Sequence, residues 1–370
     1  MAQPIDIHTK VGELHKVLGA YRQLFHLEDF RNFKHILQRC NDRTRVRIKE
    51  SHRATKKKWL NAFGEEVQLE ADADQDSSKH LELSHYVLDY IFRGYPELAL
   101  FQRGGPNKPL PVAADMKYFL RRERILSREA ETDYNAGVEE AIEEWRAQEE
   151  WRPILGFYTN VNVRRVVSKV HAFGLEDFED LTMDDFVPTL NREELKHKVK
   201  TITTRFLRVF QLASVLGNVE VMVHQQTHRI ARVKEDSAKF FQTIYNKLRE
   251  HEELGHVYVA PKSMYEPTFK CISEIDATTV VVSLNPDMPL RQILADLIRQ
   301  PGTDFEPPAA ILCKHVVETL SDPDLSNLPA AMYEGNDPYS LNVTSGFLKY
   351  LGYHIGQLES SSYSLYIPEG

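Results

Sequence analysis

Lysine and arginine gather in one short stretch of the chain. Residues 31–60 hold eleven basic side chains against two acidic ones, whereas the whole chain of 370 residues has a formal net charge of −8. The centre of this segment carries Arg43, Arg45, Arg47, Lys56, Lys57 and Lys58. Trp59 follows directly, so cations stand beside an aromatic ring, a combination suited to binding a phosphate backbone with bases stacked nearby. A nuclear localisation signal at residues 56–58 is the competing interpretation.

Smaller basic clusters recur further along the chain. Their members are Arg164, Arg165, Lys198, Arg205, Arg229 and Arg232. If several of these clusters line one groove, they form an electrostatic track for a polyanion. The alternative for each is a solvated surface that pairs with the glutamates of residues 139–150.

Signatures of enzymes and metal sites are missing from the sequence. His224 and His228 would share a helix face, but the intervening HQQTH pattern lacks the glutamate of a zinc protease motif. No Gly-rich phosphate loop and no GxSxG elbow is present. We therefore expect no catalytic residues, no metal and no cofactor. An enzyme with a pocket near residues 255–290 is the third and least favoured reading.

Composition indicates a folded chain in a reducing compartment. Hydrophobic residues make up 42% and charged residues 27%, as in ordinary globular proteins. Cys40, Cys271 and Cys313 are odd in number and far apart, which argues against a disulfide framework. No signal peptide and no apolar stretch of about 18 residues is seen. We expect a cytoplasmic protein without membrane insertion, with the nucleus as the alternative, or the virion if the chain is viral.

Apolar periodicity predicts helices over most of the chain. Helices are expected within 8–62, 81–100 and 113–151, and a seam of apolar residues at helical spacing predicts another over 195–209. A further helix is expected after Gly217, up to about residue 253, and would complete a central helical hairpin. The acidic stretch 65–78 is expected to be a solvated loop.

The residue pattern changes after Gly255, from helical periodicity to short β-branched runs. Residues 256–259 and 278–284 are short and β-branched, as strands are, and helices are expected over 290–300 and 308–320. Residues 347–355 and 363–367 are expected to pair as a terminal hairpin. These patterns predict a mainly α fold of two helical lobes with a small α/β or β-hairpin element in the C-terminal third. The expected regions are 1–110, 111–254 and 255–370.

Two resemblances accompany these patterns. Residues 171–206, HAFGLEDFEDLTMDDFVPTLNREELKHKVKTITTRF, are similar to part of a SAM domain, with an L-T-x-x-D step before a basic amphipathic helix. We attribute this match to helix capping by Thr182 and Asn191. In size, helical content and distributed basic patches, the chain resembles nucleoproteins of negative-strand RNA viruses. That resemblance implies oligomerisation along genomic RNA.

Together these observations favour non-enzymatic binding of single-stranded RNA through its phosphate backbone, by a homo-oligomer of a nucleocapsid kind. The alternative is a scaffold or adaptor subunit whose charged helices bind proteins. Charge reversal in the basic segment separates the two, because only the first predicts loss of RNA.

Overall fold

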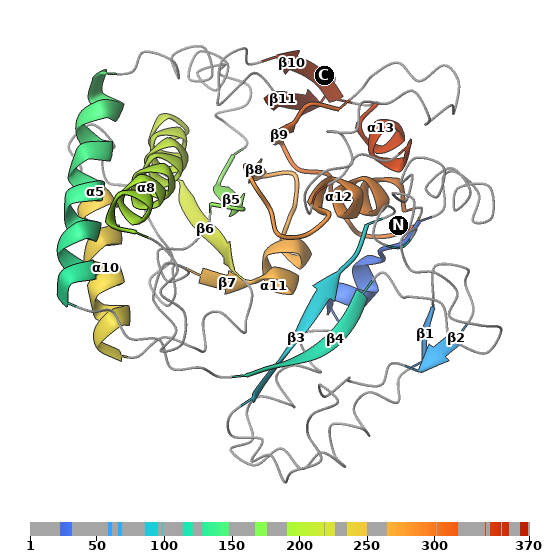
Figure 1. Cartoon of the computed structure of the whole chain (residues 1–370). Coiled ribbons are helices and arrows are strands. Elements are labelled where there is room, and N and C mark those ends of the chain that lie inside the picture. Colours follow the sequence, from blue (N-terminus) through green and yellow to red (C-terminus); the bar gives the residue numbers. More distant parts are fainter. Residues whose placement is uncertain are drawn as a thin grey trace, which may run out of the picture.

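The architecture is a mixed sheet with helices on both faces (Figure 1). The structure is a computed structural model, and it describes residues 23–31, 58–60, 66–68, 86–94, 98, 114–120, 128–147, 167–175, 191–217, 219–225, 235–249, 265–300, 302–316, 337, 341–348, 350–354 and 363–368. All statements about structure below refer to these residues.

Five parallel strands form the larger part of a seven-stranded sheet, from one edge inward. They are β5 (Lys169–Phe173), β6 (Glu220–Gln225), β7 (Tyr265–Pro267), β8 (Thr279–Ser283) and β9 (Ala310–Lys314). Their order in space is β7-β6-β5-β8-β9, so the chain builds outward from β5 in both directions. The run of β-branched residues in β8 is buried throughout, as expected of a parallel strand covered on both faces.

An antiparallel hairpin extends the sheet beyond β9. Strand β11 (Tyr363–Pro368) pairs with β9, and β10 (Tyr350–His354) pairs with β11 at the margin. This pairing confirms the terminal hairpin expected from the sequence. It also joins the last strand of the chain to the core.

Three helices cover one face of the sheet (Figure 1). They are α5 (Arg128–Ala147), α8 (Arg192–Val215) and α10 (Glu235–Arg249), and they share a hydrophobic core with the strands. Asn191 caps α8, because its side chain accepts a hydrogen bond from the Glu194 amide while the Glu194 carboxylate accepts one from the Asn191 amide. Leu195, Val199, Ile202, Phe206 and Val209 are all buried, so the predicted apolar seam is confirmed.

The opposite face is covered by α11 (Thr268–Ser273), α12 (Leu290–Arg299) and α13 (Leu341–Phe347). A second hydrophobic core lies here, and it includes Phe25, Leu27 and Phe30 of the N-terminal segment and Phe92 of strand β3 (Tyr86–Phe92). The rings of Phe30 and Phe92 stack with centroids 5.5 Å apart. The N-terminal segment is therefore packed against the same core as α12.

Two small antiparallel ladders complete the described structure. Strand β3 (Tyr86–Phe92) pairs with β4 (Ala114–Leu120), and β1 (Lys58–Leu60) pairs with β2 (Glu66–Gln68). Helices were predicted where β1, β3 and β4 lie, and a loop was predicted over β2. Those four predictions are wrong.

The mainly α fold class is wrong, and the protein is α/β. Residues 220–225 form β6 and residues 310–314 form β9, although helices were predicted over both. The expected helical hairpin is instead a β5-α8-β6-α10-β7 succession with parallel strands. Short apolar runs buried on both faces have no period-two pattern, so they resemble buried helix segments in sequence.

Other expectations have mixed outcomes. Helix α12 and strand β8 are confirmed within a few residues. The sheet combines strands from both sides of residue 255, where a boundary was expected. The SAM-like stretch begins with strand β5, whereas a SAM domain is helical; its capping by Asn191 is confirmed. Residues 256–259 and Thr182 lie outside the described residues.

Candidate ligand site at the carboxyl edge of the sheet

The direction of the crossovers reverses between β5 and β8. Helices α8 and α10 lie on one face, whereas α11 and α12 lie on the other. The connections that leave the carboxyl ends of β5 and β8 therefore diverge. In open α/β sheets, ligands bind outside the carboxyl ends of the strands at such a point.

Gly174 fixes the backbone at this reversal. Its φ of +72° is a left-handed conformation, and the Asn285 amide donates a hydrogen bond of 3.2 Å to its carbonyl oxygen. The Leu284 amide likewise donates to the Phe173 carbonyl oxygen at 3.1 Å. The pairing of β5 with β8 thus continues into the loop after β8. This edge of the sheet is rigid and closely packed.

A row of polar side chains crosses the carboxyl ends on the α12 side. Phe173 is in register with Ser283, and Cys313 is in register with Ser364. Ser283 and Cys313 each stand one residue beyond the last aligned pair of β8 and β9, so they continue the same row. Ser283 is only 1% exposed, and its hydroxyl has no hydrogen-bond partner among the described residues. Such a buried, unpaired hydroxyl is unusual in a native fold.

His224 extends the row on the other side of β5. Its ring stacks on that of Phe173, with centroids 5.0 Å apart and planes 25° from parallel. Because His224 lies in β6, the helical spacing that would aim it and His228 at one metal ion does not exist. His228 lies outside the described residues. Among the residues the structure describes, no three His, Cys, Asp or Glu side chains gather as a metal site.

A buried ion pair lies where α12 begins, beside β9. The Arg291 Nε donates to Asp337 Oδ2 at 3.1 Å, and the Arg291 backbone amide donates to Asp337 Oδ1 at 2.8 Å. Both side chains are almost fully buried. The Arg291 Nη1 also donates to the carbonyl oxygen of His315 at 3.1 Å, just after β9 ends. Burial raises the pKa of Asp337, and the guanidinium beside it opposes that rise.

A hydroxyl pair holds the imidazole of His315 at the same end of β9. Its Nδ1 lies 3.0 Å from the Ser364 hydroxyl and 3.5 Å from the Tyr366 hydroxyl. The Val316 amide donates to the Tyr366 oxygen at 2.7 Å. Residues of β9, β11 and α12 therefore converge on one short segment. Burial raises the pKa of the neighbouring Cys313 thiol, so this sulfur stays protonated at neutral pH.

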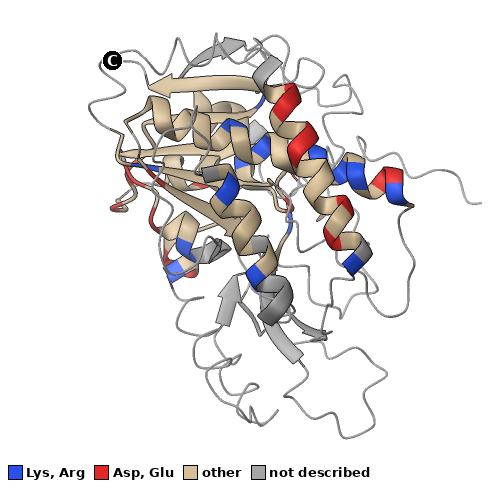
Figure 2. Ribbon diagram, turned by 90° about the vertical axis from the view of Figure 1, so that its left-hand side faces the viewer, with Lys and Arg blue, Asp and Glu red and all other residues tan. Residues whose placement is uncertain are grey.

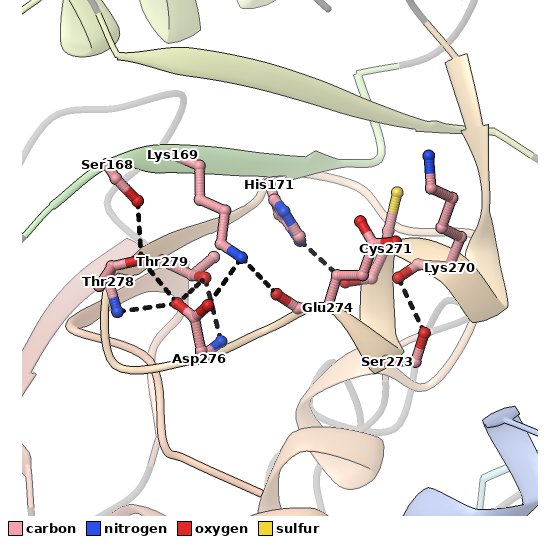
Figure 3. Close-up of polar contacts among 10 residues, drawn as sticks. All are labelled: Ser168, Lys169, His171, Lys270, Cys271, Ser273, Glu274, Asp276, Thr278 and Thr279. Atoms are coloured by element: carbon pink, nitrogen blue, oxygen red, sulfur yellow. Dashed lines mark hydrogen bonds and ion pairs between the residues drawn. The ribbon is translucent and has the colours of Figure 1, made fainter.

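The amino edge of the sheet carries a different cluster (Figure 3). The Lys169 ammonium donates to Asp276 Oδ2 at 2.8 Å and to the Glu274 carbonyl oxygen at 2.7 Å. The Asp276 carboxylate also accepts hydrogen bonds from Thr278 and Thr279 within the turn that leads into β8. Burial alone would raise the Asp276 pKa, but these hydrogen bonds lower it below its ordinary value. We interpret the cluster as a structural brace between β5 and β8.

The basic helix α8 is neutralised in part by the acidic helix α5. Ion pairs join Lys196 to Glu140 at 2.5 Å, Arg192 to Asp133 at 2.9 Å, and Lys200 to Glu144. Figure 2 shows the acidic bands of α5 beside the basic bands of α8 where the helices pack together. This arrangement matches the alternative reading of that cluster, in which the charges pair on the surface.

Of the predicted RNA contacts, only Lys198 and Arg205 have described side chains, and both belong to α8 and not to the carboxyl-edge row. Lys198 is exposed on α8, and Arg205 is half-buried two turns later. Lys58 begins β1, and the structure describes only its backbone. The remaining predicted contacts fall outside the described residues: Arg43, Arg45, Arg47, Lys56, Lys57, Arg164, Arg165, Arg229 and Arg232.

Sequence reasoning missed the residues at the carboxyl edge. The available signal was a polar or glycine residue close to the end of each buried strand: Gly174 directly after β5, Asn285 two residues after β8 and His315 directly after β9. No described helix has the length and apolarity to cross a membrane. Comparisons with protein-family models, curated proteins and solved structures find no significant match.

Proposed function

We propose that the protein binds a small polar molecule at the carboxyl ends of β5, β8 and β9. The observation that carries this proposal is the reversal of crossover direction between β5 and β8, which is where open α/β sheets bind ligands. The unpaired Ser283 hydroxyl supports it independently, because a bound molecule would supply the hydrogen-bond partner that the fold does not.

The side chains at this edge favour a ligand without a phosphate group. The Arg291 guanidinium is already neutralised by Asp337, and no Gly-rich loop follows β5. The Ser283 hydroxyl and the His315 imidazole remain along this edge, where the rings of Phe173 and His224 stack on each other. Nucleosides have the matching features, since they combine a flat ring with several hydroxyl groups. They are the probe class that we would test first.

The test is a thermal unfolding series with adenosine, uridine and their 5′-monophosphates. We expect a nucleoside to raise the unfolding midpoint in a concentration-dependent manner, and the added phosphate to weaken the effect. Ser283→Ala should leave stability nearly unchanged, because its hydroxyl is unpaired, and should weaken binding about tenfold. Ser168→Ala at the amino edge is the matched control. Binding that is equally strong in Ser283→Ala, or no shift with any of the four compounds, would reject the proposal.

RNA binding is the second proposed function, and it rests on a separate observation. Residues 31–60 carry a large excess of positive charge in a chain that is acidic overall. The ion pairs between α5 and α8 reduce the contribution of Lys196 and Lys200, so the N-terminal segment would supply most of the affinity. Homo-oligomerisation along RNA belongs to the same proposal.

Charge reversal tests this second function. Nucleic acid that copurifies at low salt, read by the absorbance ratio at 260 and 280 nm with size exclusion, should disappear when Arg43, Arg45, Arg47 and residues 56–58 become Glu. Lys196→Gln with Lys200→Gln is the control, because these lysines are already paired. A clean protein spectrum in the unmodified protein at low salt would reject RNA binding and favour the scaffold alternative.

A further inference from the structure

His315, which directly follows β9, occupies a position unlike that of His171 in β5. His171 is 0% exposed, and its Nδ1 hydrogen bonds to the Cys271 carbonyl oxygen at 2.8 Å under α11. His315 is half-buried at the carboxyl end of β9, on the same face as Ser364. A histidine that is partly open to solvent at the ligand edge can exchange a proton with a bound molecule, whereas a fully enclosed one cannot.

The backbone and the ring of His315 are both fixed from outside β9. Arg291 holds the His315 carbonyl oxygen, and the buried Asp337 holds Arg291 in turn. Ser364, which is 1% exposed, lies 3.0 Å from the ring Nδ1. A side chain oriented in this way loses little conformational freedom when it acts on a ligand.

Ser364 lies within strand β11, and its hydroxyl is already paired with the ring of His315, whereas the hydroxyl of Ser283 is unpaired. The Tyr366 oxygen already accepts a hydrogen bond from the Val316 amide and lies 3.5 Å from the same His315 nitrogen. The hydroxyls of Ser364 and Tyr366 therefore orient the imidazole.

We infer that His315 is a proton-exchanging residue of the carboxyl-edge site, with Ser364 and Arg291 as its positioning residues. This inference rests on the proposed small-molecule site and names the chemistry performed there. The imidazole takes a proton from a hydroxyl or ammonium group of the bound molecule and returns it later, so that no other reactant is consumed. Among the described residues, the charged groups placed next to it are Arg291 and Asp337, which neutralise each other, and Lys314, which precedes it in the chain; the neighbouring Cys313 is a thiol.

The test is the reactivity of the histidines toward diethyl pyrocarbonate in the full-length folded protein, mapped by mass spectrometry. His315 should be modified, with a rate that rises as the imidazole loses its proton, while His171 should stay unmodified as an internal control. Ser364→Ala should change the modification rate of His315 at least threefold or shift its pH midpoint. Ser364→Thr, which keeps the hydroxyl, should restore the rate and pH midpoint of the unmodified protein. Circular dichroism of each variant separates this effect from unfolding.

Two results would overturn the inference. One is an unmodified His315 in the folded protein, and the other is an identical pH profile in the unmodified protein and in folded Ser364→Ala. Failure of the proposed ligand is distinguishable, because that outcome appears as no thermal shift while His315 still reacts. Protection of His315 by adenosine at a concentration that raises the unfolding midpoint would support both proposals together.

Discussion

A Cβ atom on Gly174 would lie 2.1 Å from the carbonyl carbon of Asn285. The two residues follow β5 and β8, the adjacent strands at which the crossover direction reverses. Their backbones approach this closely because Gly174 has no side chain and adopts a φ of +72°. The loop after β8 is thereby held against the end of β5, where we place the ligand site.

Gly174→Ala is expected to destabilise the protein by at least about 4 kcal/mol, because the new methyl group would collide with backbone that cannot move aside. Gly302→Ala is the matched control. Gly302 has the same φ of +72°, but nothing lies within 4 Å of an added Cβ. Its variant should lose about 1 kcal/mol, from backbone strain alone. Chemical denaturation and soluble yield measure the difference, and equal losses in the two variants would contradict the close approach.

Asp296 on α12 anchors the N-terminal segment. Its Oδ2 accepts hydrogen bonds from the backbone amides of Leu24 at 2.8 Å and Phe25 at 3.2 Å. Asp296→Ala should cost about 2–4 kcal/mol, because two amides lose a shared charged acceptor in a buried place. Hydrogen exchange at residues 24 and 25 should accelerate. Asp304→Ala, at an exposed ion pair with Arg31, should leave the unfolding midpoint nearly unchanged. An equal effect of the two variants would contradict the anchoring role.

His171 should make stability depend on pH in the mildly acidic range. Burial lowers its pKa to about 4, so the unfolded chain takes up a proton on this side chain more readily than the folded chain. Stability is therefore full above about pH 6.5 and decreases as the pH falls toward 4, by about 3 kcal/mol in total. His171→Asn keeps a donor for the Cys271 carbonyl oxygen and cannot titrate. The urea denaturation midpoint of this variant should change less with pH over this range. A pH dependence equal to that of the unmodified protein would argue against a neutral buried imidazole.

Asp276 should make stability depend on pH in a more acidic range than His171 does. Its pKa is lowered in the folded protein by the hydrogen bonds from Lys169, Thr278 and Thr279, which outweigh the effect of burial. The stabilisation is present above the unfolded pKa of about 4 and is lost as the pH falls below it. Because the Asp276 side chain is 40% exposed, we expect Asp276→Asn to cost on the order of 1 kcal/mol at pH 7. The variant should also lose less stability than the unmodified protein between pH 4 and 2, as followed by circular dichroism.

Local sequence signals predicted part of the fold. The capping residues and apolar seam of α8 are contiguous in the chain, and the β-branched run of β8 is distinctive on its own. Strands β6 and β9 are short and have apolar centres buried on both faces, so they share their sequence pattern with buried helix segments. Their parallel pairing depends on contacts across many tens of residues. The periodicity of apolar residues within one segment does not show which other segment it pairs with.

The candidate site was not predicted, for a related reason. Gly174, Ser283, His315 and Ser364 are widely separated in sequence, and only the strand order brings them to one edge. Charge density is visible in sequence, so it directed the prediction toward the basic segments. Lys196 pairs with Glu140 and Lys200 pairs with Glu144, on two helices that are far apart in sequence but packed together. Such pairs neutralise part of the positive charge that the sequence displays.

The most direct test of the carboxyl-edge site is hydrogen–deuterium exchange with and without the most stabilising of the four nucleoside compounds. We predict slower exchange in the loop of residues 284–289 and at Gly174, and unchanged exchange at the amino-edge turn of residues 276–279. Protection at the amino edge, or no protection at residues 284–289 despite a thermal shift, would contradict the assignment of the ligand site.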